Sequence, residues 1–252
     1  MSLAPEEVER YARHIFLREI GGPGQQKLKA ARVAMVGAGG LGASALMYLA
    51  AAGVGHIRVI DDDVVDLSNL QRQVIHDTTA VGTAKVESAQ ARLGEINPHV
   101  EVQPKCARLN AETAEELLSG VDLVLDGSDG FETRYLVNET CVALDLPLVS
   151  AAMTQWEGQI GLYRPSTGGP CYRCVFPNRP APGLVPSCAE AGIMGALAGV
   201  MGSMMAAEAI KWITGAGADL SGRLMLYDAL WGENRVITVA RNPECPVCGA
   251  SA

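Results

Sequence analysis

Three glycines and one aspartate have the spacing of a nucleotide site. Gly37, Gly39 and Gly42 form a Gly-x-Gly-x-x-Gly pattern between an apolar run and a helical pattern, and Asp61 lies nineteen residues after Gly42. Glycines let backbone N–H groups approach phosphate, and a carboxylate at the end of the next strand accepts hydrogen bonds from ribose. Glycines that serve helix–strand packing alone would leave Asp61 unexplained. The pattern predicts a bound nucleotide without separating NAD from ATP.

Three charged residues elsewhere in the chain favour ATP. Arg72 follows the second expected strand, Lys85 lies in the next expected helix, and Asp129 lies just past the strand predicted at 122–125. An ATP-using enzyme must neutralise phosphate charge with Lys, Arg and a metal-binding carboxylate, whereas a dehydrogenase needs a nicotinamide pocket and a proton donor. Each residue taken alone is a typical surface charge. Together they have a joint task only if the nucleotide is ATP.

Four of the seven cysteines form two Cys-x-x-Cys pairs, Cys171 with Cys174 and Cys245 with Cys248. Four thiolates suit tetrahedral zinc with no open position, which is a structural rather than a catalytic site. Seventy residues separate the pairs, so the fold must bring them together. A redox pair is the weaker alternative, because neither Cys-x-x-Cys opens a helix after a strand.

The other cysteines are single. Cys188 lies ahead of a long apolar run, where a nearby helix N-terminus would favour the reactive thiolate. Cys106 and Cys141 are expected to be small core residues, the usual state of a free cysteine.

Alternating strands and helices must position these side chains. The residue patterns predict strands at 32–36, 56–61, 100–104, 122–125 and 146–151, and helices at 5–20, 41–52, 79–96, 111–118 and 132–144. A glycine-rich stretch at 21–24 is expected to end the first helix. Such alternation predicts a Rossmann-like α/β fold, a mostly parallel sheet with helices on both faces and the carboxyl ends of the parallel strands at one edge. Ligands bind at that edge.

The pattern changes after residue 152. Strands are predicted at 159–163, 223–227 and 235–239, with a long apolar helix between the first two and a segment rich in Pro, Gly and Cys at 164–188. We expect antiparallel strands that continue the same sheet in the C-terminal half. No linker is evident, so residues 1–252 are expected to form a single domain, with a nucleotide-binding half at 1–152 and a second half at 153–252.

Composition argues against several classes of protein. The net charge of −8 and the lack of a Lys/Arg run argue against broad nucleic-acid binding. Residues 191–207 contain no charge, but seventeen residues are too few for a membrane span, and Gly195-x-x-x-Gly199 predicts a buried helix that another backbone approaches closely. The N-terminus lacks a secretory pattern, so a cytoplasmic location is expected.

Seven short motifs together resemble one family. RYARHIFL, GAGGLG, SNLQRQ, GTAK, DGSDGFETRYLVN, GPCYRC and PECPVCG occur in the order of the ThiF/MoeB/HesA family, bacterial adenylyltransferases related to ubiquitin-activating enzymes. The resemblance covers residues 5–249. It implies ATP-dependent adenylation of the C-terminal Gly-Gly carboxylate of a small ubiquitin-like sulfur-carrier protein, with release of pyrophosphate, for molybdenum cofactor or thiamine thiazole biosynthesis.

The resemblance also implies a role for each matching residue. ATP would be bound by Gly37, Gly39, Gly40 and Gly42, its ribose by Asp61, its phosphates by Asn69, Arg72 and Lys85, a magnesium ion by Asp129, and structural zinc by Cys171, Cys174, Cys245 and Cys248. Arg13 would enter the site of the other subunit of a homodimer. The resemblance also implies a candidate catalytic role for Cys188: in some relatives a cysteine of this segment bonds covalently to the carrier or takes part in sulfur transfer, and in others it is dispensable. The carrier would dock on the half at 153–252.

One residue departs from the family pattern and keeps two other functions open. The metal-binding aspartate is usually followed by Asn, and Gly130 stands there instead, which removes any hydrogen bond from the Asn side chain. An NAD-dependent oxidoreductase is one alternative, and a zinc-stabilised scaffold that binds ATP and a carrier without turnover is the other. The sequence determines neither the carrier, the sulfur donor nor the roles of Trp156 and Trp231.

Overall fold

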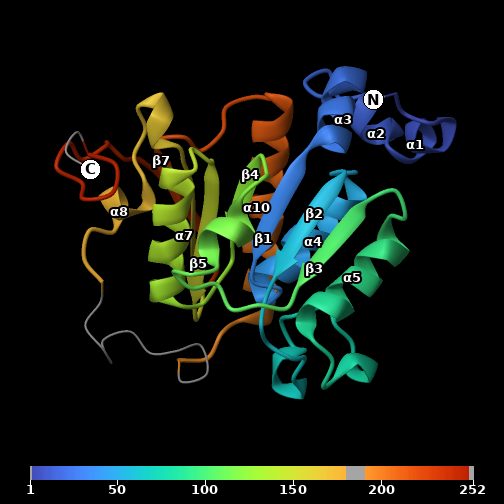
Figure 1. Ribbon diagram of the computed structural model, residues 1–252, viewed down its shortest axis with the longest axis horizontal. Coiled ribbons are helices and arrows are strands. Elements are labelled where there is room, and N and C mark those ends of the chain that lie inside the picture. The colour runs from blue at the N-terminus through green and yellow to red at the C-terminus, as the bar shows by residue number, and fades with distance from the viewer. Residues whose placement is uncertain (1, 180–190, 250–252) are drawn as a thin grey trace.

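The computed structural model describes residues 2–179 and 191–249, and these residues build an eight-stranded sheet (Figure 1). The strands run in the order β3-β2-β1-β4-β5-β6-β7-β8. Their bounds are β1 Arg32–Val36, β2 His56–Ile60, β3 Glu101–Lys105, β4 Leu123–Asp126, β5 Leu148–Thr154, β6 Glu157–Tyr163, β7 Arg223–Asp228 and β8 Glu233–Thr238. Strands β1 to β5 are parallel, and β6 to β8 continue the sheet in antiparallel pairs. The predicted fold class is confirmed.

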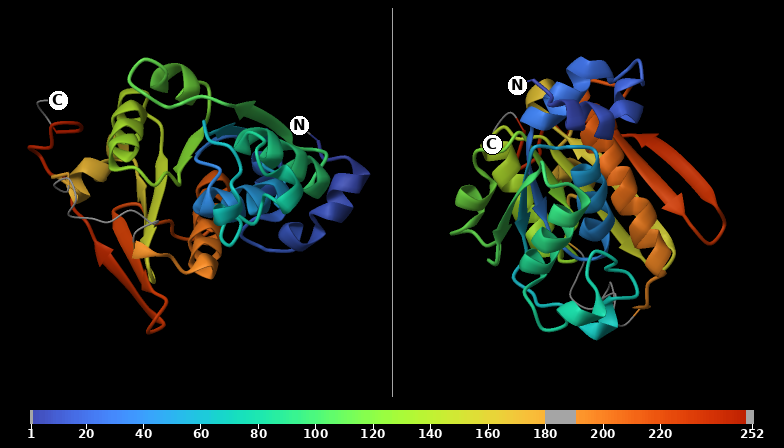
Figure 2. Two further views of the ribbon diagram at one scale, coloured as in Figure 1. Left: turned by 90° about the horizontal axis from the view of Figure 1, so that it is seen from below. Right: turned by 90° about the vertical axis from the view of Figure 1, so that its right-hand side faces the viewer.

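Helices cover both faces of this sheet (Figures 1 and 2). The longer ones are α3 Gly21–Ala30, α4 Gly40–Ala51, α5 Lys85–Ile96, α7 Phe131–Ala143 and α10 Gly195–Thr214. The shorter ones are α1 Pro5–Arg10, α2 Ala12–Ile15, α6 Ala114–Leu118, α8 Tyr172–Val175 and the 3-10 turns η1 Leu67–Asn69, η2 Thr78–Ala80 and η3 Pro165–Thr167.

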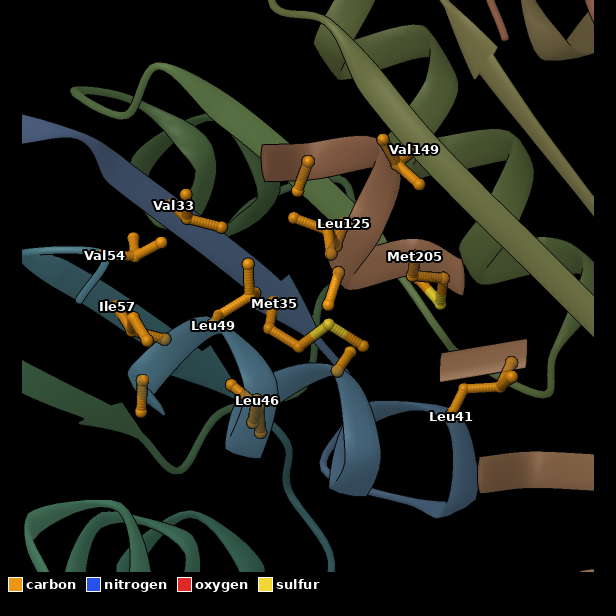
Figure 3. Packing of buried hydrophobic residues seen from close by; sticks show 14 of the residues in the cluster. Val33, Met35, Leu41, Leu46, Leu49, Val54, Ile57, Leu125, Val149 and Met205 are labelled. Carbon is orange, nitrogen blue, oxygen red and sulfur yellow. The ribbon is translucent and has the colours of Figure 1, made fainter. Parts of the chain in front are cut away.

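The central strands are apolar throughout because both of their faces are buried. Successive side chains of a strand point to opposite faces. Met35 therefore packs with α4, α5 and α10 in one core, whereas Val36 packs with α6 and α7 in the other. Figure 3 shows Met35 among Leu46 and Leu125 in the first core. The two cores hold the carboxyl ends of β1, β2 and β4 in register at one edge.

Helix α10 is long and apolar enough to cross a membrane when judged by length and composition alone, and no other helix in the described residues passes that test. Its packing identifies it as a core helix, since Leu197, Met201 and Met205 are fully buried against the first core. Glu208 also lies within the helix, where it is buried and forms an ion pair with Lys211. The prediction of a buried helix in this segment is confirmed.

The close approach of α10 to α4 depends on Gly202, which lies outside the predicted Gly195-x-x-x-Gly199 motif. A Cβ at Gly202 would lie 2.1 Å from Ser44 Oγ and 2.2 Å from the Leu41 carbonyl oxygen. Of the two motif glycines, Gly195 lies against a backbone carbonyl, whereas the Cβ position of Gly199 has nothing within 4 Å. The predicted close approach is therefore right for Gly195 and wrong for Gly199.

Four other local predictions were wrong. Segment 5–20 forms two short helices instead of one, and Gly21 begins α3 rather than ending a helix, because Pro23 suits the first turn of a helix. The helix predicted from residue 79 begins at Lys85, since Asp77 caps the separate turn η2. Cys106 is exposed because it follows β3, the edge strand of the sheet, whereas Cys141 is buried as predicted.

Replacement of Gly202 by Ala is expected to destabilise the fold, because the added methyl group would overlap Ser44 Oγ and the Leu41 carbonyl. Overpacking of this kind costs about 1–3 kcal/mol. Gly199→Ala is the matched control in the same helix, and there Ala is favoured over Gly by up to about 1 kcal/mol. Thermal unfolding should show a lower Tm for Gly202→Ala and an equal or higher Tm for Gly199→Ala. Unchanged Tm in Gly202→Ala would contradict the close packing of α4 and α10.

Candidate nucleotide site and metal centre

Two glycines at the turn between β1 and α4 lie where a larger residue would be strained or would clash. Gly37 has a φ of +91°, a conformation that favours glycine, and a Cβ there would lie 3.3 Å from the Gly127 carbonyl. A Cβ at Gly42 would lie 2.0 Å from the Gly37 carbonyl oxygen. Helix α4 thus begins directly against the turn, and no side chain caps it at Gly39. Its first backbone N–H groups are left for an anionic ligand.

Asp61 follows β2 and orders this turn. Its Oδ2 accepts a hydrogen bond from the Ala38 N–H at 2.7 Å, and its Oδ1 accepts one from the Asp63 N–H at 2.9 Å. Burial raises the pKa of Asp61, and the neighbouring Lys85 charge opposes that effect. A carboxylate has about four acceptor positions, so Asp61 can bind ribose hydroxyls while it holds the turn.

Two cationic side chains lie beside the turn. Lys85 is the first residue of α5, its side chain is 5% exposed, and its Nζ lies 2.7 Å from Asp63 Oδ2. Arg72 is half-buried and donates from Nη2 to Asn69 Oδ1 at 2.7 Å. A Cβ at Gly40 would lie 3.4 Å from Arg72 Cγ, which places the arginine stem against the start of α4. The fold therefore brings Arg72, Lys85 and Asn69 to the edge where the glycine turn lies.

The loop after β4 completes this edge. Arg134 donates to the Ser128 carbonyl from Nη2 at 2.8 Å and from Nε at 3.2 Å. Asp126 is fully buried and accepts the Ser128 N–H at 3.0 Å, and burial raises the pKa of this carboxyl. Asp129, which follows Ser128 in the chain, is exposed. Because Gly127 touches the glycine turn, Asp129 is presented at the same edge as the cationic side chains.

Two buried polar atoms at this edge lack a hydrogen-bond partner among the described residues, namely Gln73 Oε1 and Ser128 Oγ. Gln73 Nε2 also lies 3.6 Å from the Cβ position of Gly39. Buried polar groups are nearly always paired. The Ser128 hydroxyl could donate to a phosphate oxygen of a nucleotide, and Gln73 Oε1 could accept a hydrogen bond from a ribose hydroxyl. Neither residue was predicted from the sequence to belong to the site. Their only signal is their place in the SNLQRQ and DGSDGF motifs.

Arg13 does not reach the site of its own chain. It is exposed on α2, and its neighbour His14 lines a pocket with Ala51 and Ala52 at the C-terminal end of α4. The glycine turn lies at the other end of this twelve-residue helix, about 18 Å away. Figure 1 shows the N-terminal helices and the teal segment after β2 at opposite ends of β1. Cys188 lies outside the described residues.

The two Cys-x-x-Cys pairs meet where α8 lies beside the C-terminal segment (Figure 1). The Sγ–Sγ distances are 3.6 Å for Cys171–Cys245, 3.4 Å for Cys174–Cys248 and 3.9 Å for Cys171–Cys174. Ligand atoms of all four cysteines lie within 4.8 Å of one another. Tetrahedral zinc with Zn–S bonds of ~2.3 Å requires sulfur separations of roughly 3.8 Å. The four cysteines could therefore hold a zinc ion, and the prediction that the fold brings the pairs together is confirmed.

Comparison with known proteins places this arrangement in a family. The model of the ThiF family matches residues 11–247. The chain belongs to the ThiF family. A relative from Thermus thermophilus, named sulfur carrier protein adenylyltransferase, is 51% identical over 99% of this chain and 93% of the relative. A relative from Haloferax volcanii, named SAMP-activating enzyme E1, is 48% identical over 99% of this chain and 92% of the relative.

Solved structures agree with membership of the ThiF family. Escherichia coli MccB in complex with MccA-N7isoASN has a TM-score of 0.85 and 25% identity, with 95% of this chain and 74% of that chain covered. The complex of the same protein with ATP has a TM-score of 0.82 and 27% identity, with 95% and 73% covered. Together with the relatives, these likenesses identify the ThiF family chain as an enzyme of the adenylyltransferase class.

The departure from the ThiF family pattern at Gly130 is not forced by packing. Gly130 is the N-cap residue of α7, with φ −92° and ψ 130°. A Cβ there would lie 3.4 Å from Thr133 Oγ1 and would meet no other atom closer than that. A Cβ is therefore tolerated at this position, and nothing in the structure explains the glycine there.

The ThiF family chain is expected to bind one zinc ion per molecule through its four clustered cysteines. Elemental analysis of the purified protein should show this stoichiometry, and Cys248→Ser should lower it. Cys106→Ser is the matched control, since Cys106 is exposed and lies outside the cluster. Acidification should release the metal, because protons compete with zinc for thiolates. Equal metal content in the two variants would remove Cys248 from the set of ligands.

Proposed function

We propose that the chain catalyses the ATP-dependent adenylation of the C-terminal Gly-Gly carboxylate of a small ubiquitin-like sulfur-carrier protein, with release of pyrophosphate. The observation that carries the proposal is the convergence of the glycine turn with Arg72, Lys85 and Asp129 at one sheet edge. The name of the Thermus thermophilus relative supports a sulfur carrier as the substrate. An NAD-dependent oxidoreductase would leave these three charged residues without a common task.

The charge distribution at this edge suits adenylation. The attacking carboxylate is already ionised at neutral pH and needs no general base, but it must approach a polyanion. Arg72 and Lys85 would offset this repulsion and stabilise charge on the departing pyrophosphate. Asp129 would hold Mg²⁺, which supplies further positive charge beside the phosphates. Lys85 would then share its ammonium group between Asp63 and a phosphate oxygen.

The remaining residues of the site have roles in binding ATP. The proposal assigns the glycine turn, Gly37, Gly39, Gly40 and Gly42, to the phosphates, Asp61 to the ribose, and Asn69 to orienting Arg72 toward a phosphate. It assigns the four cysteines, Cys171, Cys174, Cys245 and Cys248, to structural zinc. Reduced cysteine ligands and ATP coexist in the cytoplasm, where we place the reaction.

We assign residues 1–152 to nucleotide binding and residues 153–252 to carrier docking. The β7–β8 hairpin projects from the body in both views of Figure 2. Its tip carries Leu230 and Trp231, which are 55% and 76% exposed, and the Ala229 N–H donates at 2.8 Å to the carbonyl of Trp156, itself 42% exposed. β7 ends and β8 begins at the edge where β5 ends, which is the nucleotide edge. Exposed apolar clusters of this kind mark protein contact surfaces.

A homodimer would give Arg13 access to a nucleotide site. Arg13 lies near the C-terminal end of α4, too far from the glycine turn of its own chain. The surface around Arg13 suits self-association, since Phe16 is 75% exposed and Tyr48 is 58% exposed beside the pocket at His14. Apolar side chains left in water at this level favour burial in an interface. In such a dimer, Arg13 would enter the nucleotide site of the partner.

ATP–pyrophosphate exchange tests the proposed function directly. Purified protein with Mg²⁺ should catalyse exchange with a Gly-Gly-ending carrier and fail with the same carrier lacking its last glycine. The carrier that gives the fastest exchange would decide between molybdenum cofactor and thiamine thiazole biosynthesis. ATP binding without exchange for any carrier would refute adenylation and favour the non-catalytic scaffold.

Single substitutions at the charged edge are expected to slow exchange. Arg72→Ala, Lys85→Ala and Asp129→Ala should each lower the rate by roughly 10² to 10³, the usual effect of losing one contact that stabilises transition-state charge. Arg58→Ala is the control, since Arg58 is a cation of the same sheet that binds carbonyls at Leu117 and Ser119 away from the site. Near-normal kinetics in any one variant would remove that residue from the site.

Subunit mixing tests the proposed role of Arg13. Arg13→Ala and Arg72→Ala homodimers should both be nearly inactive in exchange. Mixed dimers should regain activity, because one of their two sites combines an intact Arg72 with an intact Arg13 from the partner. Exchange measured after the two variants are mixed and re-equilibrated shows the outcome. No recovery, when mixed dimers are confirmed by mass, would place Arg13 outside the partner's site.

A further inference from the structure

His76 connects the glycine turn to helix α5, and the proposed function has not used it. The residue is 6% exposed and lies between the 3-10 turn η1 and the start of α5. Its Nε2 lies 3.0 Å from the Ala38 carbonyl oxygen, and its Nδ1 lies 2.9 Å from Ser88 Oγ. The imidazole thus joins the middle of the glycine turn to the helix that begins with Lys85.

The two contacts determine which ring nitrogen carries the proton. A backbone carbonyl only accepts hydrogen bonds, so Nε2 must donate to Ala38. In the neutral ring, Nδ1 is then the acceptor, and the Ser88 hydroxyl can donate to it. Burial lowers the pKa of His76, and the Lys85 charge adds to that effect, whereas the hydrogen bond to Ala38 and the charges of Asp61 and Asp77 oppose it without reversing it. The ring is therefore neutral at neutral pH, with its hydrogen on Nε2.

Ala38 is held on both sides of its backbone. Asp61 Oδ2 accepts the Ala38 N–H at 2.7 Å, and His76 Nε2 donates to the Ala38 carbonyl at 3.0 Å. The peptide bond from Ala38 to Gly39 is planar and trans, so its C=O and N–H point in opposite directions. The Gly39 N–H consequently points away from His76, and among the described residues it has no hydrogen-bond acceptor.

We propose that His76 is a positioning residue that turns the Gly39 N–H toward the phosphates of ATP, an inference that rests on the nucleotide site of the proposed function. The residues on both sides of Ala38 are glycines, whose backbone rotates more freely than that of any other residue. Without the bond from His76, the Ala38–Gly39 peptide would sample other orientations. The Gly39 N–H would then be available to a phosphate oxygen only part of the time.

Two variants of similar size separate positioning from folding. In His76→Gln the side-chain amide can still donate at the place of Nε2, whereas the amide of His76→Asn is too short to reach Ala38. His76→Asn should weaken ATP binding on the order of 10-fold, the effect of losing one hydrogen bond to a charged group. Binding of adenosine, which has no phosphate, should stay unchanged, and His76→Gln should restore most of the ATP affinity. Calorimetry measures both ligands.

The outcomes separate this inference from the proposed function. Equal losses for ATP and adenosine in His76→Asn, or no loss for either, would overturn the positioning role. If the variants do not fold, ¹⁵N-histidine NMR of the wild-type protein still decides, because a hydrogen on Nδ1 rather than Nε2 of His76 would overturn it as well. Wild-type protein that binds ATP but shows no exchange would refute adenylation while leaving the role of His76 intact.

Discussion

The proposed site depends on how closely three backbone segments approach one another at the carboxyl edge of the sheet. The turn after β1, the first turn of α4 and the loop after β4 meet at Gly37, Gly42 and Gly127. A Cβ at Gly42 would lie 2.0 Å from the Gly37 carbonyl oxygen. Both atoms are fixed by the backbone, so a change of side-chain rotamer could not remove this clash. Any larger residue there would push α4 away from β1, and the N–H groups at its start would move with it.

This close approach also determines the electrostatics of the site. Asp61 and Asp126 lie where burial raises the pKa of each carboxyl. Hydrogen bonds from backbone N–H or hydroxyl groups oppose this effect, because they stabilise the ionised carboxylate. Asp61 receives two backbone N–H groups, and Asp126 receives the Ser128 N–H and the Ser150 hydroxyl. Both carboxylates therefore order the loops beside them. Lys85 is held near this edge by Asp63, so its stem is ordered before any phosphate arrives.

The sequence patterns predicted local elements better than their junctions. The strand at 32–36 was predicted residue for residue, because a buried parallel strand is a continuous apolar run between turn signals. The start of α3 at Gly21 was missed because glycine usually ends helices, and the fold here supplies the packing that offsets its low propensity. Cys106 was expected in the core because free cysteines are usually buried, but its position beyond the edge strand depends on strand order, which local patterns do not encode.

The sequence by itself determined the fold class, the glycine turn and the two cysteine pairs, because each of these is encoded by residue types at short spacing, and it singled out the charged residues of the proposed site. The tertiary structure decided which residues that are distant in the sequence lie close together. It joined cysteine pairs separated by seventy residues, placed Arg13 a helix length from its own glycine turn, and left Gln73 Oε1 and Ser128 Oγ buried without partners beside that turn. It also brought His76 against Ala38, a contact between residues 38 positions apart. Such contacts depend on how the crossovers order the strands, and that order is set by packing over the whole sheet rather than by any short segment.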